Sequence, residues 1–239
     1  MGLRDGLVGA WCPSLGATAG TLLDRSRRNN HGTLTNMDPA TDWVQSGGRG
    51  ALDFDGSNDQ VNTTSLLPTA NARSVSCWVL TRSVASGEAW VFSAGYNNTN
   101  QAIMLGRVAA TLFVTQYGAA VSGGTLVTNQ WFHIATSHTG QVWRLYLNGV
   151  QTATGTMATT PTAHPVFIGS VDGSLFWSGQ IDDVAIWQRE LTPPEIRQLY
   201  QQGRGGWLRQ SQRRTYGFVQ AGFKAYWARR QGQIIGGGT

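Results

Sequence analysis

The stretch SGQIDDVAIW at residues 178–187 decides the fold class of this chain. Its apolar and polar residues alternate, and a period of two is typical of a strand with one buried face. Similar segments stand at 7–11, 74–80, 131–135 and 142–147, separated by Gly, Asn, Asp, Ser and Thr. The chain is therefore predicted to be all-β. The buried residues expected in the first stretch are Ile181, Val184, Ile186 and Trp187.

The residues that join and end the strands support this prediction. Asn148-Gly149 predicts a hairpin, because both turn positions need a positive φ. Residues 191–203, LTPPEIRQLYQQG, predict one short helix. Thr192 can cap this helix, Glu195 stands at the capping-box position, and Gly203 can end it. Many short strands followed by a single helix are typical of a two-sheet antiparallel sandwich.

The composition excludes several other classes of protein. The chain has 239 residues, 13% of them charged, with 31 Gly and 10 Trp. Disordered chains carry more charge and fewer aromatic residues, and collagen needs Gly at every third position. Cys12 and Cys77 are too few for a disulfide scaffold. Two buried free thiols are expected, although pairing of the two cysteines stays open.

No segment of the sequence resembles a targeting or membrane element. A stretch of about 18 apolar residues, which a membrane-spanning helix needs, is absent from the sequence. The N-terminal residues lack a basic region followed by an apolar one, so no signal peptide is expected.

The net charge of +5 is unevenly distributed along the chain. Residues 1–203 carry 11 basic and 13 acidic groups, a net charge of −2, whereas residues 204–239 carry seven basic groups and no acid. The sequence thus predicts a β domain over residues 1–203 and a basic, aromatic C-terminal arm over residues 204–239. Such asymmetry indicates a partner for the arm.

The arm combines Arg with aromatic and Ile side chains, which are the residue types of interface hot spots. Docking on a protein partner is therefore favoured over contact with nucleic acid, and a helix lying on a membrane surface is a third alternative. The residues expected to dock are Trp207, Arg213, Arg214, Tyr216, Phe218, Phe223, Tyr226, Trp227, Arg229, Arg230, Ile234 and Ile235.

Seven motifs together carry a resemblance to a known family. They are GLVGAW (6–11), DRSRRNNHGTL (24–34), GALDFDGSNDQV (50–61), WFHIA (131–135), LYLNGV (145–150), GQIDDVAI (179–186) and LTPPEI (191–196). Their order and spacing resemble the laminin-G-like, concanavalin A-like jelly roll in its pentraxin-related branch, over roughly residues 6–203. The resemblance implies a jelly-roll sandwich. The arm lies outside it, and its residues 223–238 resemble the ends of phage-like proteins.

Relatives of this fold often bind Ca²⁺, so the resemblance implies a calcium site at Asp24, Asn30, Asp182 and Asp183. Asp55 and Asp59 are a second option. The alternative is that these carboxylates form turns or bind neighbouring loops, and Arg27 and Arg28, which depart from the family pattern, would repel a cation.

Sugar binding would require exposed aromatic rings. Most tryptophans stand in strands and are expected in the core, whereas Trp90, Tyr96 and Trp177 are the candidate ligand-binding residues.

Enzyme activity is not expected. Glycosidases need two carboxylates that flank the scissile bond, and the sequence has only three Glu. Asp182 and Asp183 are adjacent, so a regular strand would point them to opposite faces. His133 and His138 are also expected on opposite faces.

These observations favour a non-enzymatic structural or decoration protein of a phage-like particle. Its jelly roll would face outward from the virion surface, and its arm would dock on the shell or on a neighbouring subunit, as a homo-oligomer or as part of a larger assembly formed in the host cytoplasm. The alternative is an extracellular lectin-like module that binds a glycan, with or without calcium.

Overall fold

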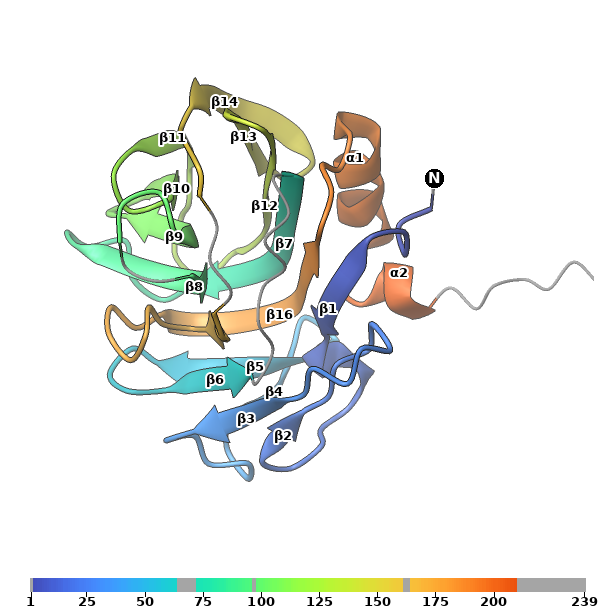
Figure 1. Cartoon of the computed structure of the whole chain (residues 1–239). Helices are drawn as coiled ribbons and strands as arrows, with labels where there is room; N and C mark the ends of the chain where they lie inside the picture. The colour runs from blue at the N-terminus through green and yellow to red at the C-terminus, as the bar shows by residue number, and fades with distance from the viewer. Residues whose placement is uncertain (1, 64–71, 96–97, 161–163, 210–239) are drawn as a thin grey trace, which may run out of the picture. The chain divides into compact units, whose positions relative to one another are not determined.

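A computed structural model of the chain describes residues 2–63, 72–95, 98–160 and 164–209. These residues form a sandwich of two antiparallel sheets, as the sequence predicts, with two short helices on one side (Figure 1). The all-β jelly-roll prediction is confirmed.

The first sheet has eight strands. Its order is β14 (Val150–Thr156), β13 (Val142–Leu147), β12 (Trp131–Thr139), β7 (Ala72–Thr81), β16 (Ser178–Trp187), β5 (Arg49–Asp55) and β4 (Trp43–Ser46), with β1 (Leu7–Trp11) paired to β16.

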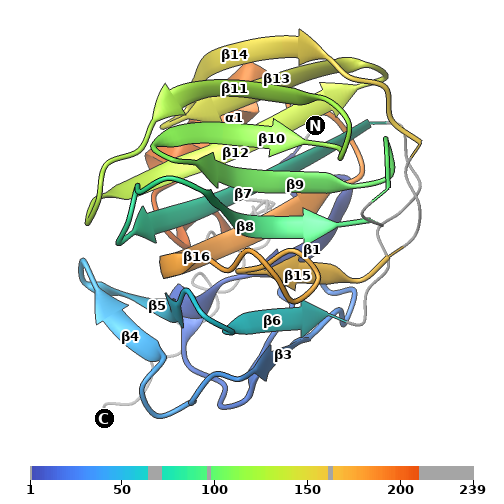
Figure 2. The ribbon, with the colours of Figure 1, turned by 90° about the vertical axis from the view of Figure 1, so that its left-hand side faces the viewer.

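The second sheet also has eight strands. Figure 2 shows it facing the viewer. Its order is β11 (Ala120–Thr125), β10 (Thr111–Thr115), β9 (Ile103–Val108), β8 (Glu88–Ala94), β15 (Val166–Ile168), β6 (Gln60–Thr63), β3 (Gly32–Thr35) and β2 (Thr21–Leu22).

The strands and the turn expected from the sequence are present. β1, β13 and β16 have the predicted bounds, and β7 and β12 extend the predicted segments. Asn148 and Gly149 take φ values of 50° and 77° and join β13 to β14, so the hairpin prediction is confirmed. Asn and Gly tolerate this left-handed conformation best.

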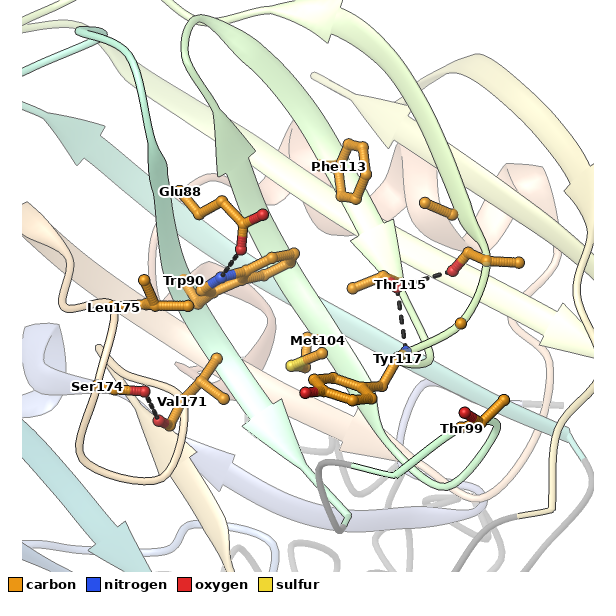
Figure 3. A pocket seen from close by; sticks show the side chains of 13 residues that line it. Glu88, Trp90, Thr99, Met104, Phe113, Thr115, Tyr117, Val171, Ser174 and Leu175 are labelled. Carbon is orange, nitrogen blue, oxygen red and sulfur yellow. Dashed lines mark hydrogen bonds between the residues drawn. The ribbon is translucent and has the colours of Figure 1, made fainter.

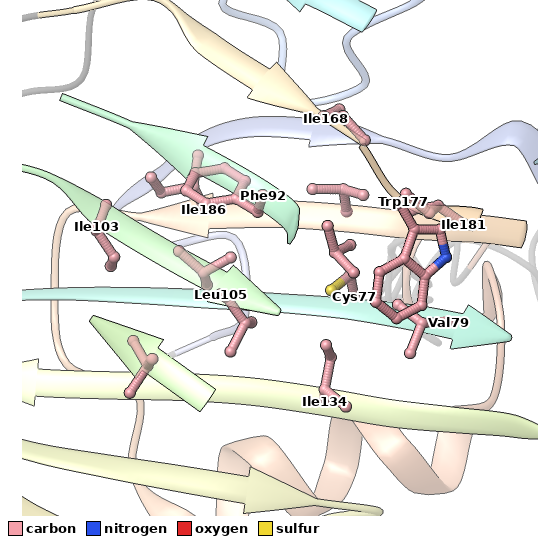
Figure 4. Close-up of a cluster of buried hydrophobic side chains, with 14 of the residues drawn as sticks. Cys77, Val79, Phe92, Ile103, Leu105, Ile134, Ile168, Trp177, Ile181 and Ile186 are labelled. Atoms are coloured by element: carbon pink, nitrogen blue, oxygen red, sulfur yellow. The ribbon is translucent and has the colours of Figure 1, made fainter. Parts of the chain in front are cut away.

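The main core lies between the two sheets. Three of the four side chains predicted to be buried in β16, those of Ile181, Val184 and Ile186, lie in this core (Figure 4), whereas Trp187 is buried on the other face of the sheet. The close-up labels Cys77, Val79, Phe92, Ile103, Leu105, Ile134, Ile168, Trp177, Ile181 and Ile186. Cys12 and Cys77 are buried and free, so the expectation of unpaired thiols is confirmed.

A second apolar cluster joins the helices to the outer face of the first sheet. The helix α1 (Pro193–Gln202) begins and ends where the sequence predicted, and the Glu195 carboxylate accepts a hydrogen bond from the Thr192 N–H at 2.9 Å. Ile196 and Leu199 of α1 pack with Trp187 of β16. The short elements η1 (Pro13–Leu15) and α2 (Gly206–Arg209) were not predicted.

The β domain extends past its predicted end at Gly203. Residues up to Arg209 belong to the same compact unit. Trp207 is 5% exposed and joins the second cluster, and Arg204 is 6% exposed. The segment after Gly203 therefore belongs to the domain as far as Arg209, because Arg204 and Trp207 are buried against it.

Candidate functional site

A cavity of about 760 Å³ opens on the outer face of the second sheet. This volume lies within the range of roughly 300–1,000 Å³ that is typical of small-ligand sites. Strands β8, β9 and β10, the turn that joins β10 to β11, and the loop after β15 enclose it (Figure 3). The lining residues are Glu88, Trp90, Thr99, Met104, Phe113, Thr115, Tyr117, Gly118, Ala119, Ala120, Val171, Ser174 and Leu175.

The floor of the cavity is apolar and follows from strand periodicity. Ile103 and Leu105 of β9 point into the main core, so Met104 between them points outward. There it packs in a third small cluster with Trp90, against which Phe113 lies. The ring centroids of Trp90 and Phe113 are 6.0 Å apart in an edge-to-face arrangement, which is favourable for aromatic pairs.

A glycine makes room for the indole ring on this floor. A Cβ atom at Gly106 would stand 2.3 Å from the Ala89 carbonyl oxygen and 2.8 Å from the Trp90 Cα. Backbone atoms cannot move aside at such distances. A larger residue at this position would therefore displace β8 and the Trp90 side chain with it.

Two exposed apolar side chains form the rim. Tyr117 is 50% exposed and Leu175 is 45% exposed. Both have the left-handed backbone conformation that such residues rarely adopt, with φ values of 66° and 52°. Strained backbone of this kind costs on the order of 1–3 kcal/mol and is found most often at binding and active sites. Its presence at both rim positions supports a binding role for the cavity.

The polar side chains of the cavity are few, and those of Glu88, Thr115 and Ser174 are held by hydrogen bonds within the protein. The Trp90 indole N–H lies 3.3 Å from one oxygen of the exposed Glu88 carboxylate, which leaves the other oxygen available. The Thr115 hydroxyl donates to the Ala119 carbonyl at 2.7 Å, and the Ser174 hydroxyl donates to the Val171 carbonyl at 2.7 Å. An apolar floor with a small number of placed polar groups suits a ligand that has both an apolar face and hydroxyl groups.

Of the three predicted ligand-binding residues, one lines the cavity, one is buried in the core and one lies outside the described residues. Trp90 lines the cavity, although it is only 2% exposed. Trp177 was expected on the surface, but it is fully buried in the core because it lies where the chain enters β16. Tyr96 lies outside the described residues.

Phe113 and Tyr117 were not predicted as site residues. The alternation of TLFVT at residues 111–115 could have placed Phe113 on a sheet face, and the following Tyr117-Gly118 could have indicated an exposed turn. Nothing in the sequence shows that this face belongs to the outer side of the second sheet.

Asp24 and Asn30, two of the predicted calcium ligands, hold their own loop in place. The Asp24 carboxylate accepts hydrogen bonds from the backbone N–H groups of Ala10, Ser26 and Asn30 at 2.8–3.0 Å. The Asn30 side-chain amide donates to the Val8 carbonyl at 2.9 Å. These contacts match the alternative to calcium binding, in which the carboxylates form turns or bind neighbouring loops.

The other two predicted ligands, Asp182 and Asp183, are buried beneath α2. The Asp182 carboxylate lies 3.2 Å from the Arg204 Nε, an ion pair that lacks hydrogen-bond geometry, and accepts a hydrogen bond from the Ser14 N–H. The Asp183 carboxylate accepts hydrogen bonds from the Gly205 N–H at 2.9 Å and the Trp207 indole at 3.0 Å. All four oxygens therefore face protein groups.

The prediction that Asp182 and Asp183 point to opposite faces is wrong. A bulge interrupts the register of β16 between Asp182 and Ala185, and Asp183 takes a φ of 55°. The bulge turns both carboxylates toward residues 204–207. Burial, with the neighbouring Asp182 charge, raises the pKa of Asp183 to about 7, and burial raises the pKa of Asp182 as well.

In the part of the chain that the structure describes, no three His, Cys, Asp or Glu side chains gather into a group that could hold a metal ion. The same residues contain no helix that is long and apolar enough to cross a membrane.

Of the predicted docking residues, only Trp207 falls within the described part. It is buried in the domain and donates to Asp183, so it is not available to a partner. The other predicted docking residues, from Arg213 to Ile235, lie outside the described residues.

Several solved structures share this fold. Domain 4 of AbnA, an extracellular arabinanase from Geobacillus stearothermophilus solved with arabinotriose, is 21% identical with a TM-score of 0.62; the match covers 80% of this chain and 97% of that domain. The sialidase of Trypanosoma rangeli is 18% identical with a TM-score of 0.59, over 82% of this chain and 32% of the sialidase. The binding domain of botulinum neurotoxin serotype D is 14% identical with a TM-score of 0.62, over 83% of this chain and 52% of that domain.

The TM-scores show a shared fold. This chain spans about a third of the sialidase and about half of the toxin domain. No curated protein sequence matches this chain significantly. A family model described as the concanavalin A-like lectin/glucanases superfamily matches residues 55–197, more than half of the chain. The jelly-roll fold and this match agree, and the chain belongs to the concanavalin A-like lectin/glucanase superfamily.

Proposed function

We propose that this protein is a non-enzymatic carbohydrate-binding module that holds a sugar in the cavity on the second sheet. The observation that carries the proposal is the rim residue Tyr117, which is 50% exposed at a strained backbone position above an apolar floor. An exposed ring beside Trp90 and Phe113 offers the apolar surface against which the C–H face of a sugar packs. The arabinanase domain of the same fold, solved with arabinotriose, supports this proposal.

Binding without catalysis is favoured by the acidic groups of the cavity. Hydrolysis of a glycosidic bond uses a pair of carboxylates roughly 5–9.5 Å apart. Among the described residues that line the cavity, Glu88 is the only carboxylate. Asp182 and Asp183 form a close pair, but they are 0% and 3% exposed and hold α2 in place.

The proposal is tested by substituting the rim residue. Tyr117→Ala should weaken binding of a neutral oligosaccharide such as arabinotriose, or of the best binder on a glycan array, at least about tenfold, equivalent to about 1.4 kcal/mol. Titration calorimetry provides the affinity. Val150→Ala is the matched control, since Val150 is 61% exposed in the β13–β14 hairpin of the other sheet. Equal affinities of the wild-type protein and Tyr117→Ala, or the absence of any glycan ligand, would contradict the proposal.

A second function is proposed for the C-terminal arm, namely docking on a neighbouring subunit or on the shell of a phage-like particle. Its support is the charge distribution. The described domain to Arg209 holds equal numbers of basic and acidic groups, whereas residues 210–239 hold five basic groups and no acid. Since the domain carries no net charge, the arm is the part of the chain that would attract an acidic partner or a partner that binds aromatic side chains.

Analytical ultracentrifugation tests the neighbouring-subunit form of this second proposal. The full chain should self-associate, and a chain that ends at Arg209 should remain monomeric. Equal sedimentation of the two chains would exclude docking between copies through the arm.

A further inference from the structure

The cavity has an unequal supply of charge and hydrogen-bond donors. Among the described lining residues, Glu88 is the only carboxylic acid, and there is no Arg, Lys or His. Arg107, which belongs to β9, is 6% exposed and donates to the Ala85 and Ala109 carbonyls. These two hydrogen bonds hold the Arg107 guanidinium against the chain segments that flank β9. A ligand in this cavity therefore meets a negative charge with no cation beside it.

Two of the four hydroxyl groups in the lining, those of Thr115 and Ser174, already donate within the protein, which leaves Thr99 and Tyr117 as the hydroxyl donors for a ligand. A hydroxyl has one proton to donate and two lone pairs that accept. The Thr115 proton is directed to the Ala119 carbonyl, and one Thr115 lone pair accepts the Tyr117 N–H at 3.1 Å. The Ser174 proton is directed to the Val171 carbonyl. Both side chains therefore face a ligand mainly as acceptors.

The Glu88 carboxylate is the strongest acceptor of the cavity. One of its oxygens lies 3.3 Å from the Trp90 indole N–H, which orients the group above the aromatic floor. The other oxygen can accept a charge-assisted hydrogen bond, which is stronger than one between neutral groups. A ligand gains most here if it brings hydroxyl donors and no negative charge of its own.

We propose that Glu88 is a specificity-determining residue that makes this cavity select neutral sugars and reject sugars that carry a carboxylate, sulfate or phosphate group. The inference rests on the proposed function, since it names the ligand class of the same site. Neutral sugars present several hydroxyl donors to Glu88, Thr115 and Ser174. An anionic group is an acceptor without a proton to give, so it would leave these acceptors unpaired and would face Glu88 with a like charge.

Matched pairs of glycans test this inference. Lactose and 3′-sialyllactose differ by one acidic sugar, and an array that holds neutral, carboxylated and sulfated forms of one oligosaccharide extends the comparison. The wild-type protein should bind the neutral member of each pair at least about tenfold more tightly. Glu88→Gln keeps the shape of the side chain and removes its charge. This variant should reduce that preference at least about tenfold, by weaker binding of the neutral member, tighter binding of the acidic member, or both.

Asp172→Asn is the control for net charge. Asp172 is exposed in the loop that carries Ser174 and Leu175, but it does not line the cavity. Its φ of 45° also suits Asn, so the loop should be preserved. The preference of Asp172→Asn for neutral glycans should equal that of the wild-type protein.

The outcomes separate this inference from the proposed function. If acidic glycans bind as tightly as neutral ones or more tightly, and Tyr117→Ala abolishes that binding, the neutral selection is wrong and the sugar site stands. An unchanged preference in Glu88→Gln would also overturn the role of Glu88. If no glycan binds, or if Tyr117→Ala binds as the wild-type protein does, the proposed function fails and this inference fails with it.

Discussion

At the scale of single residues, His133 shows how burial sets the response of the domain to acid. Its Nε2 atom lies 2.8 Å from the Ser76 hydroxyl, and its ring packs edge-on against Trp78 and near Tyr200 of α1. Burial lowers the pKa of His133 to about 3, because the charged imidazolium would lose its hydration. Burial lowers the pKa of His138 to about 4 for the same reason. The two rings contact opposite faces of the first sheet, as the sequence predicted.

The sign of the resulting pH dependence follows from proton binding. Between pH 6.5 and about pH 3, the unfolded chain binds a proton at His133 that the folded domain does not. The stability that His133 contributes is therefore complete above pH 6.5 and is lost as the pH falls toward 3. His133→Gln can keep a polar contact to Ser76 and removes this titration. It should lose less stability than the wild-type protein when urea unfolding is measured at pH 7.5 and at pH 4.5.

His164→Gln is the control for this comparison, since His164 stands before β15 and is only partly buried, whereas His133 is fully buried. Its loss of stability between the two pH values should match that of the wild-type protein. If His133→Gln also matches the wild-type protein, the buried neutral histidine does not contribute to acid sensitivity.

At the scale of secondary-structure elements, local sequence signals predicted the fold class, the strands β1, β7, β12, β13 and β16, and the helix α1. The alternation of apolar and polar residues predicted the bounds of β1, β13 and β16, and the capping residues predicted the bounds of α1. Each of these signals depends only on residues that are neighbours in the chain. The bulge at Asp182–Asp183 depends instead on residues 204–207, which follow more than 20 positions later. Alternation alone could not show it, and the predicted orientation of the two carboxylates was wrong for that reason.

The candidate site was less predictable than the strands. Trp90 was identified, whereas Trp177 was misplaced and Phe113 and Tyr117 were not identified. A strand pattern shows that two faces differ, but it does not show which face meets the other sheet. That choice depends on the order of β8, β9, β10 and β11 in the sheet, which long-range pairing sets.

The short segment that ends with α2 should be essential to the domain. It supplies Arg204, whose guanidinium pairs with Asp182, lies 3.8 Å from the centroid of the Trp131 ring and donates to the Ser46 carbonyl. It also supplies Trp207, which donates to Asp183. Its removal would leave two buried carboxylates without these partners, and breaking a buried ion pair costs about 3–5 kcal/mol.

Two truncated chains measure this contribution. A chain that ends at Arg209 should unfold in denaturant with the free energy of the full chain, whereas one that ends at Gly203 should be about 3–5 kcal/mol less stable. The difference should grow as the pH rises through about 7, where Asp183 ionises in the full domain. With the partners gone, both carboxylates become harder to ionise, and protonation at lower pH relieves them. Equal stability of the two truncated chains would show that the segment only covers the surface.

At the scale of the whole molecule, the charge separates the chain into two parts at Arg209. The domain holds 13 basic and 13 acidic groups, and its basic side chains include Arg204 and Arg209, which the sequence analysis had assigned to the arm. The arm retains five basic groups and no acid. The proposed sugar site is lined by residues of the domain, so a chain that ends at Arg209 should bind neutral glycans with unchanged affinity.

The salt dependence of association distinguishes the partners of the arm. If its five basic groups bound duplex DNA by phosphate contacts alone, the slope of log K against log salt would reach about −4.5, a loss of affinity of roughly 500-fold between 50 and 200 mM salt. Docking through its aromatic and Ile side chains depends on burial of apolar surface, which salt weakens little. We therefore expect self-association of the full chain in ultracentrifugation to change less than about tenfold over this range, while anisotropy with a labelled DNA duplex reports any binding to nucleic acid. Tight DNA binding with the steep slope, together with no self-association, would assign the arm to nucleic acid instead.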